Sequence, residues 1–249
     1  MNRQISLILL LIFGLSFQAC KNNAQTSTQT DLNDENSVIV DDKQGEIRVP
    51  KSPERVVLFD LGALDIFDEL GLKDRVVGIP KQTIPTYLEE YKNDKSVINT
   101  GSLIEPNFQK VNEANPDLII IGYRQEKDYD EFSKIAPTVY LDLDYEDYIN
   151  SISKNLQRIG EIYDMKEEAD AVNEDMLQTI KEESADYKGL KGLFVMYNNG
   201  KFSAYGLKSR FGFVHDNFGV TPVSEDIEAS GHGLSISSEY IQEMNPDIL

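Results

Sequence analysis

The stretch QKVNEANPDLIII, residues 109–121, predicts a helix followed directly by a buried strand. The proline of its Asn-Pro-Asp sequence prevents the helix from continuing, and the apolar run after it begins the strand. Residues 239–249, EYIQEMNPDIL, repeat this pattern 130 positions later. Because the residues around the Asn-Pro-Asp sequence also match, we interpret the two stretches as an internal duplication and the chain as two related lobes.

Alternating strands and helices surround the first copy of the repeat. Strands are predicted at residues 56–59, 76–79, 118–122 and 138–141, and helices at residues 61–70, 107–114 and 127–135. Gly71 follows the first helix at the position where helices commonly end in left-handed backbone. This alternation predicts an α/β lobe with a mostly parallel sheet, which we assign to residues 45–145.

A helical region and a second set of strands follow. Apolar residues spaced three and four apart predict one helix over residues 147–163 and another that begins near Ala169, within a helical region of residues 146–187. We interpret the first of these helices as a rigid connector. Strands are predicted at residues 193–197 and 202–205, joined by an Asn-Asn-Gly turn typical of a hairpin. They open a second α/β lobe, residues 188–249.

The second copy of the repeat stops early in its strand. The first-lobe strand continues through Ile121, whereas the equivalent strand has only two residues before the sequence stops at Leu249. A sheet that stops inside a buried strand is left incomplete. The predicted fold is therefore two Rossmann-like α/β lobes joined by a single long helix, with a second lobe that is truncated at its C-terminus.

The N-terminus has the pattern of an export signal. Arg3 precedes an apolar run at residues 5–17, which at about 13 residues is too short for a membrane-spanning helix of roughly 20. Cys20 follows this run after a small residue and resembles the lipidated cysteine of a bacterial lipoprotein; an ordinary cleaved signal with an incidental cysteine is the alternative. We assign residues 1–19 to a signal peptide. The polar residues 20–44 have too little apolar surface to order themselves, so we assign them to a flexible linker.

The composition excludes several classes of function. Among 249 residues, 24 are basic and 43 acidic, and this net charge of −19 disfavours a nucleic-acid binder, which needs a basic surface. Two histidines and one cysteine provide no Cys–His pair, three-histidine zinc set or HExxH motif. No glycine-rich phosphate loop is present. We therefore expect a binding protein with no intrinsic cofactor, and keep a periplasmic hydrolase that uses an acidic pair as a remote alternative.

Two arginines and a histidine are the candidate ligand-binding residues. Arg124 follows strand 118–122, at the carboxyl end where α/β sheets bind ligands. Arg210 lies between strand 202–205 and a helix predicted at residues 214–218, and His232 lies in a loop rich in serine and glycine. Each is by itself more often an ordinary surface residue. All three, however, follow elements expected to end on the side that faces the other lobe, which indicates an anion-binding site.

The motifs around these residues resemble those of one family. Residues 101–108, GSLIEPNF, with residues 116–121 and 124–125, resemble the first lobe of the ferric-siderophore-binding proteins of ABC importers. The second lobe is matched by residues 202–206, 209–212, 215–216, 232–233 and 238–241. Within this family, the resemblance is greatest to the branch that binds catecholate siderophores such as petrobactin and enterobactin. It extends over residues 45–249.

This resemblance implies a cargo and a set of site residues. It implies two α/β lobes joined by one long helix, a ferric siderophore as cargo, and Arg124 and Arg210 as the residues that grip it. His232 is implied as an iron ligand when the siderophore supplies too few donors. A third arginine, expected from the repeat at position 254, and a later tyrosine would lie beyond Leu249. Cobalamin or haem is the alternative cargo for the same fold.

The resemblance also implies partners and a location. Members of the family dock to an ABC permease, which works with an ATPase, through an acidic residue on each lobe. Glu239 matches the second-lobe position. Gln109 occupies the first-lobe position, and Glu105, one turn earlier, is expected to substitute for the missing acid. We expect a monomer that is anchored to a membrane through lipidated Cys20, lies outside the cytoplasm and binds no nucleic acid.

Overall fold

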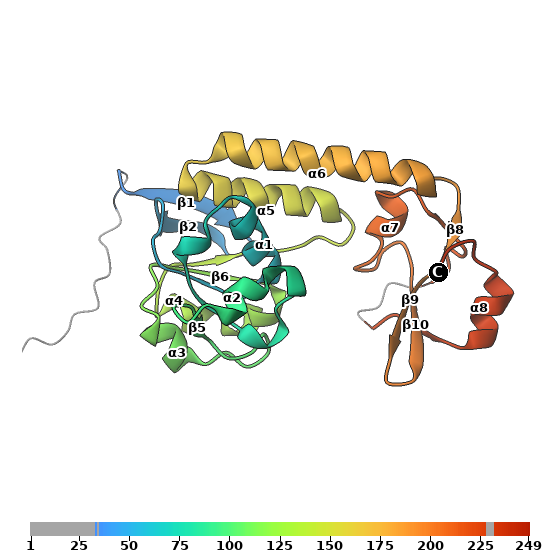
Figure 1. Ribbon diagram of the computed structural model, residues 1–249, viewed down its shortest axis with the longest axis horizontal. Helices are drawn as coiled ribbons and strands as arrows, with labels where there is room; N and C mark the ends of the chain where they lie inside the picture. Colours follow the sequence, from blue (N-terminus) through green and yellow to red (C-terminus); the bar gives the residue numbers. More distant parts are fainter. Residues whose placement is uncertain (1–32, 34, 228–231) are drawn as a thin grey trace, which may run out of the picture.

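The computed structural model describes residue 33 and residues 35–227 and 232–249. Figure 1 shows two α/β lobes bridged by one long helix: the first lobe extends from β1 to α5, and the second from β8 to α8. The predicted signal peptide, Cys20 and most of the predicted linker lie outside the described residues. Within the described part of the chain, no helix combines the length and the apolar character that a membrane crossing requires.

The first lobe is built on a parallel sheet with strand order β5-β4-β3-β6-β7. The strands are β3 (Val56–Leu58), β4 (Val76–Ile79), β5 (Ile98–Asn99), β6 (Leu118–Ile121) and β7 (Thr138–Tyr140). Alternate residues of the central strands enter opposite cores: Val56 and Leu58 pack on one face, and Val57 and Ile119 on the other. Burial on both faces explains why these strands are continuously apolar.

Helices cover the sheet, and two of them begin at side-chain caps. They are α1 (Leu61–Glu69), α2 (Glu89–Asn93), α3 (Phe108–Glu113) and α4 (Tyr129–Ser133), with 3-10 turns η1 (Lys73–Arg75), η2 (Lys81–Thr83), η3 (Thr86–Leu88) and η4 (Tyr123–Asp128). The Asp60 carboxylate accepts from the Ala63 N–H at 2.9 Å and starts α1, and Asn107 starts α3 in the same way. The predicted alternation of strands and helices is confirmed.

An N-terminal hairpin differs from the predicted linker. Strand β1 (Ser37–Asp42) pairs in antiparallel fashion with β2 (Gly45–Pro50), so the assignment of residues 20–44 to a flexible linker is wrong over β1. Val40 and Val49 are buried in the first-lobe core, and the Asp42 carboxylate accepts from the Tyr140 N–H of β7 at 2.6 Å. Burial against the rest of the lobe orders a segment that is mostly polar.

The two long helices divide their tasks differently from our prediction. Helix α5 (Tyr148–Tyr163) packs Leu156, Ile159 and Ile162 into the first-lobe core, whereas the sequence pattern suggested it as the connector. Helix α6 (Lys166–Tyr187) starts beside the end of α5 and runs across to β8, as Figure 1 shows. The connector is therefore α6, because the apolar face of α5 is buried against the first lobe.

The second lobe has a parallel strand pair, an antiparallel sheet and two short helices. Its elements are β8 (Lys191–Gly192), β9 (Phe194–Asn198), β10 (Lys201–Tyr205), α7 (Phe213–Asp216), β11 (Thr221–Pro222), β12 (Leu234–Ile236) and α8 (Ser238–Met244). β8 pairs with β11 in parallel, and the antiparallel sheet has the order β12-β10-β9. Asn199 and Gly200 connect β9 to β10 with φ of 50° and 77°, so the predicted hairpin is confirmed.

The repeated sequence has the same local structure in both lobes. Asn115 and Asn245 each end their helix in the left-handed region, with φ of 47° and 44°. The Asp117 carboxylate then accepts from two backbone N–H groups ahead of β3, and the Asp247 carboxylate accepts from the N–H that begins β8. In each lobe the motif therefore fastens a helix end to a neighbouring parallel strand.

Candidate functional site

Arg124 lies at the carboxyl end of the first-lobe sheet, in η4. The neighbouring Gln125 is buried, accepts from the Gly122 N–H at 3.3 Å and donates to the Leu103 carbonyl at 2.5 Å. These bonds fix the turn, so that Arg124 itself extends into solvent. Arg124 makes no hydrogen bond or ion pair with any residue that the structure describes. Its guanidinium is thus held on a rigid support and is free to meet a ligand.

Asp60, which sequence reasoning missed, lies beside this segment. It follows β3, the strand next to β6, and its carboxylate packs against Gly122, where a Cβ would come within 2.3 Å of Oδ2. Burial raises the pKa of the Asp60 carboxyl, although N–H groups of α1 partly oppose this shift. The signal available in the sequence was an aspartate directly after a buried strand, which we attributed to neither a cap nor a site.

Arg210 lies between β10 and α7, inside a group of aromatic side chains. Its guanidinium carbon is 5.4 Å from the ring centre of Tyr205 and 4.9 Å from that of Phe211. Nη2 donates to the Tyr205 hydroxyl at 3.3 Å. The Nε atom is buried and has no hydrogen-bond partner in the described part of the protein. A buried, charged donor without a partner is costly, so this geometry favours an incoming acceptor.

The aromatic side chains around Arg210 hold one another in place. Phe194 stacks on Phe211, with 4.1 Å between ring centres and 14° between planes, and Tyr205 meets Phe211 edge to face at 4.8 Å. Met196 completes the group, with its sulfur 3.8 Å from Arg210 Nη2. We call Phe194, Met196, Tyr205 and Phe211 the aromatic cage. The sequence placed Tyr205 and Phe211 in the motif near Arg210 but did not predict that their rings cover it.

His232 is next in the chain to Gly233, a residue that contacts the aromatic cage. It is exposed, in the turn that leads into β12, and β12 pairs with β10. The next residue, Gly233, packs against the Tyr205 ring, where a Cβ would be 2.9 Å from ring carbons. One tyrosine ring thus separates the His232–Gly233 turn from Arg210. Within residues 33, 35–227 and 232–249, no three His, Cys, Asp or Glu side chains gather as a metal-binding group.

A chain of contacts joins the two lobes next to these arginines. Phe213 of α7 stacks on Tyr148 at the start of α5, with 4.9 Å between ring centres. Burial raises the pKa of the Tyr148 hydroxyl, and the negative charge of nearby Asp60 adds to this effect. Asp60 in turn touches Gly122, two residues before Arg124. The segment that carries Arg210 therefore reaches an interlobe contact through Phe213, and no described contact joins Arg124 to Arg210 directly.

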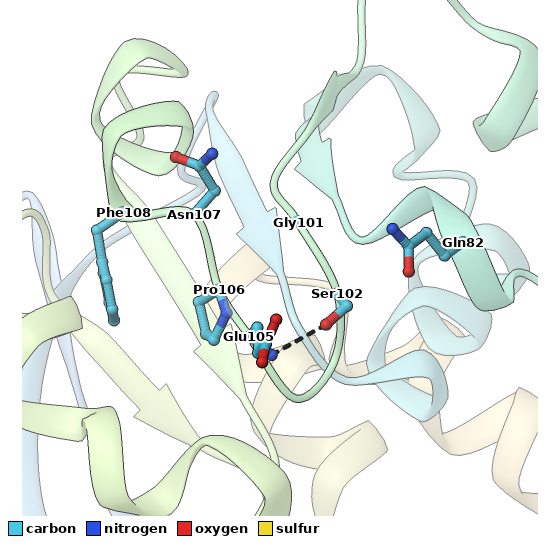
Figure 2. A pocket seen from close by; sticks show the side chains of 7 residues that line it. All are labelled: Gln82, Gly101, Ser102, Glu105, Pro106, Asn107 and Phe108. Atoms are coloured by element: carbon cyan, nitrogen blue, oxygen red, sulfur yellow. Dashed lines mark hydrogen bonds between the residues drawn. The ribbon is translucent and has the colours of Figure 1, made fainter.

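The candidate docking residues lie on exposed segments. Glu239 is exposed at the start of α8, and local hydrogen bonds lower the pKa of its carboxyl. Glu105 is exposed in the loop after β5, where its N–H donates to the Ser102 hydroxyl at 2.9 Å. This loop borders an open hollow of about 530 Å³, which Figure 2 shows with Gln82 on the opposite side. Gln109 bonds to Glu113 within α3.

Two α/β lobes on one connecting helix, with Arg124 exposed on the first lobe and Arg210 held among aromatic rings on the second, define a two-lobed α/β binding protein. The sequence matches the periplasmic binding protein family over residues 56–249, and the chain belongs to this family. It is 45% identical to the petrobactin-binding protein YclQ of Bacillus subtilis over 98% of this chain and 77% of that protein. It is 35% identical to the ferric-anguibactin-binding protein FatB of Vibrio anguillarum over 86% and 68% of the two chains.

Solved structures show the same fold. The crystal structure of YclQ superposes with a TM-score of 0.78, covering 86% of this chain and 77% of that one. The siderophore-binding protein BauB, bound to ferric iron and two acinetobactin molecules, is 31% identical with a TM-score of 0.78, covering 86% and 75%. The catecholate-siderophore-binding protein VctP of Vibrio cholerae is 31% identical, with a TM-score of 0.76 and coverage of 84% and 76%. These likenesses confirm the predicted family and the two-lobed α/β fold.

Proposed function

We propose that this protein is the substrate-binding component of an ABC importer and captures an anionic ferric siderophore of the catecholate type. The observation that carries the proposal is that both arginines have hydrogen-bond donors without a partner in the described part of the chain. Arg124 has no partner among the described residues, and Arg210 has a buried Nε without one, in a chain whose net charge is −19. The buried Nε of Arg210 is costly until an acceptor completes it, and the exposed Arg124 is available to donate to the same anion.

The chemistry of the cargo fits these two sites. A ferric tris-catecholate complex has aromatic rings and about three negative charges on its oxygens. Arginine remains protonated, donates to such oxygens, and stacks on aromatic planes. The aromatic cage holds the Arg210 guanidinium through cation–π contacts, each of about 0.5–2 kcal/mol. The arginine is thus oriented before the ligand arrives, which reduces the entropy lost on binding.

The relatives support the same class of cargo. YclQ is a petrobactin-binding protein, FatB a ferric-anguibactin-binding protein and VctP a catecholate-siderophore-binding protein. A catecholate cargo would present aromatic rings to the aromatic cage and negatively charged oxygens to Arg210.

The remaining assignments complete the proposal. His232 would coordinate iron directly when the siderophore leaves a position open, because a neutral imidazole is a suitable ligand for iron. Glu239 and Glu105 would contact the permease, which works with its ATPase. Cys20 would carry the lipid that tethers the protein to a bacterial membrane, either in the periplasm or on the outer face of the cytoplasmic membrane.

Titration with ferric petrobactin tests the cargo assignment. The chain has no tryptophan and 12 tyrosines, so quenching of tyrosine fluorescence reports binding. R210A and R124A should each weaken binding by about 10- to 100-fold, as expected for a charge-assisted hydrogen bond of about 1.5–3 kcal/mol. K208A and K127A remove an exposed positive charge close to each site and are the matched controls. If the wild-type chain binds no ferric siderophore, or if the controls lose as much affinity, the proposal is wrong.

A further inference from the structure

Lys43, in the turn of the N-terminal hairpin, reaches the segment that carries Arg124. Its Nζ lies 2.7 Å from Glu126 Oε1, and Glu126 is two residues after Arg124 in η4. The hairpin precedes the part of the chain that matches the family, which begins at residue 56. An element outside that match therefore contacts the candidate site.

The position of Lys43 is fixed by its surroundings. The preceding residue, Asp42, accepts hydrogen bonds from the N–H groups of Tyr140 and Gln44 at 2.6 and 2.7 Å. Lys43 Nζ also lies 5.3 Å from the centre of the Tyr140 ring. The ammonium group is thus held over β7 and beside η4, whereas an unsupported surface lysine would sample many rotamers. Such pre-organisation gives the ion pair with Glu126 a defined geometry.

Two acidic side chains near this edge of the sheet, Glu126 and Asp142, are paired with cations from other elements. Glu126 is paired with Lys43 of the hairpin, and Asp142, after β7, is paired with Arg158 of α5 at 3.3 Å. Burial raises the pKa of the Tyr140 hydroxyl, the Lys43 ammonium over its ring opposes this shift, and the negative charges of Glu126 and Asp142 add to it. Arg124, by contrast, has no partner among the described residues. Neither of these two carboxylates therefore compensates the charge of Arg124.

We propose that Lys43 is a positioning residue of the cargo site: its ion pair with Glu126 keeps that carboxylate from neutralising Arg124 and from repelling an anionic cargo. This inference rests on the proposed function. Without Lys43, Glu126 becomes an unpaired anion in the same turn as Arg124. One such charge within about 10 Å of a cargo with about three negative charges should weaken binding by about three- to tenfold at low salt.

A double-mutant cycle with ferric petrobactin tests this role. K43A should weaken binding by about three- to tenfold, and added salt should reduce the difference. E126Q should bind as tightly as the wild type or more tightly. K43A/E126Q should return to within about twofold of the wild type, because the unpaired charge is gone. K43R, which keeps the cation, should bind like the wild type.

The matched control is K51A. Lys51 follows β2 at the other end of the hairpin and pairs with Asp164, so its loss changes the net charge equally. K51A should bind like the wild type, and the urea midpoint of K43A should stay unchanged. The inference is overturned if K43A binds normally, or if K43A/E126Q binds as weakly as K43A, which would point to damage of the hairpin. A wild-type chain that binds no ferric siderophore overturns the proposed function and this inference together.

Discussion

Gly122 has no room for a side chain, and alanine at this position tests how firmly β3 and β6 fix the Arg124 segment. A Cβ would lie 2.3 Å from Asp60 Oδ2 and 3.2 Å from its Cγ. A normal contact between such atoms requires a separation larger by about 1 Å. The backbone of Gly122, with φ of −120°, suits alanine, so the clash alone is tested.

Two costs and one gain set the expected magnitude for G122A. Overpacking costs about 1–3 kcal/mol, and a displaced Asp60 carboxylate gives up its cap on the Ala63 N–H, about 1 kcal/mol. Reduced freedom of the unfolded chain returns about 0.4–1 kcal/mol. G122A should therefore lower the free energy of unfolding by about 1–4 kcal/mol. It should also weaken cargo binding, because a shift of either the Asp60 carboxylate or the backbone at residue 122 disturbs the segment that leads to Arg124.

Urea unfolding, followed by circular dichroism and tyrosine fluorescence, measures the effect, and D60A supplies the control. D60A alone should cost about 1 kcal/mol, the value of the cap. Because D60A removes the clashing carboxylate, D60A/G122A should be more stable than D60A by about 0.4–1 kcal/mol, the gain from reduced freedom of the unfolded chain. Strictly additive losses, or a G122A variant within about 0.5 kcal/mol of the wild type, would refute the reasoning.

Three further predictions concern the anchors of the fold. D117A removes an acceptor for two N–H groups at 2.8 and 2.9 Å and should cost about 1–3 kcal/mol in urea unfolding, more than D247A, whose carboxylate accepts from one N–H. F213A and Y148A should each lower the free energy of unfolding by the value of the lost apolar burial plus about 0.5–1.5 kcal/mol for the lost ring stacking. The double variant should lose less than the sum of the two single losses, because the stacking is lost only once. Burial raises the folded-state pKa of Asp60 above its ordinary value of 3.8, so the resulting stabilisation is complete below the unfolded-state pKa and is lost as pH rises through the folded-state pKa. In urea unfolding, the stability of the wild type should therefore fall relative to D60N as the pH rises above about 4; parallel curves would contradict this assignment.

The first-lobe sheet could be predicted because its signals are local. Strands β3, β4, β6 and β7 are short apolar runs, and turns or capping residues mark their ends. The hairpin at Asn199 and Gly200 was similarly explicit, because its left-handed backbone favours those two residue types. The sequence is sufficient to predict an element when the residues that determine it lie within about ten positions of one another.

The features that escaped prediction depend on contacts between distant segments. Nothing local to β1 indicates that Asp42 bonds to β7 or that Val40 enters the core. The aromatic cage likewise assembles residues of β9, β10 and the turn after it, and those aromatic side chains could equally have been ordinary core. The amphipathic stripe of α5 predicted a packed helix correctly, but it could not say which of two helices would span the lobes.

The 22 residues of α6 set both the distance between the two lobes and their relative rotation. At about 1.5 Å and 100° per residue, the helix is about 33 Å long, and a single inserted residue would swing everything after it by about a quarter turn. Ala169 is its one fully buried residue, so most of its side chains are free to vary. The number of residues in α6 is constrained, because the helical phase sets the orientation of the second lobe, which carries Arg210, relative to the first. Evolution is thus expected to tolerate almost any substitution on the outer surface of α6 and almost no insertion or deletion within it.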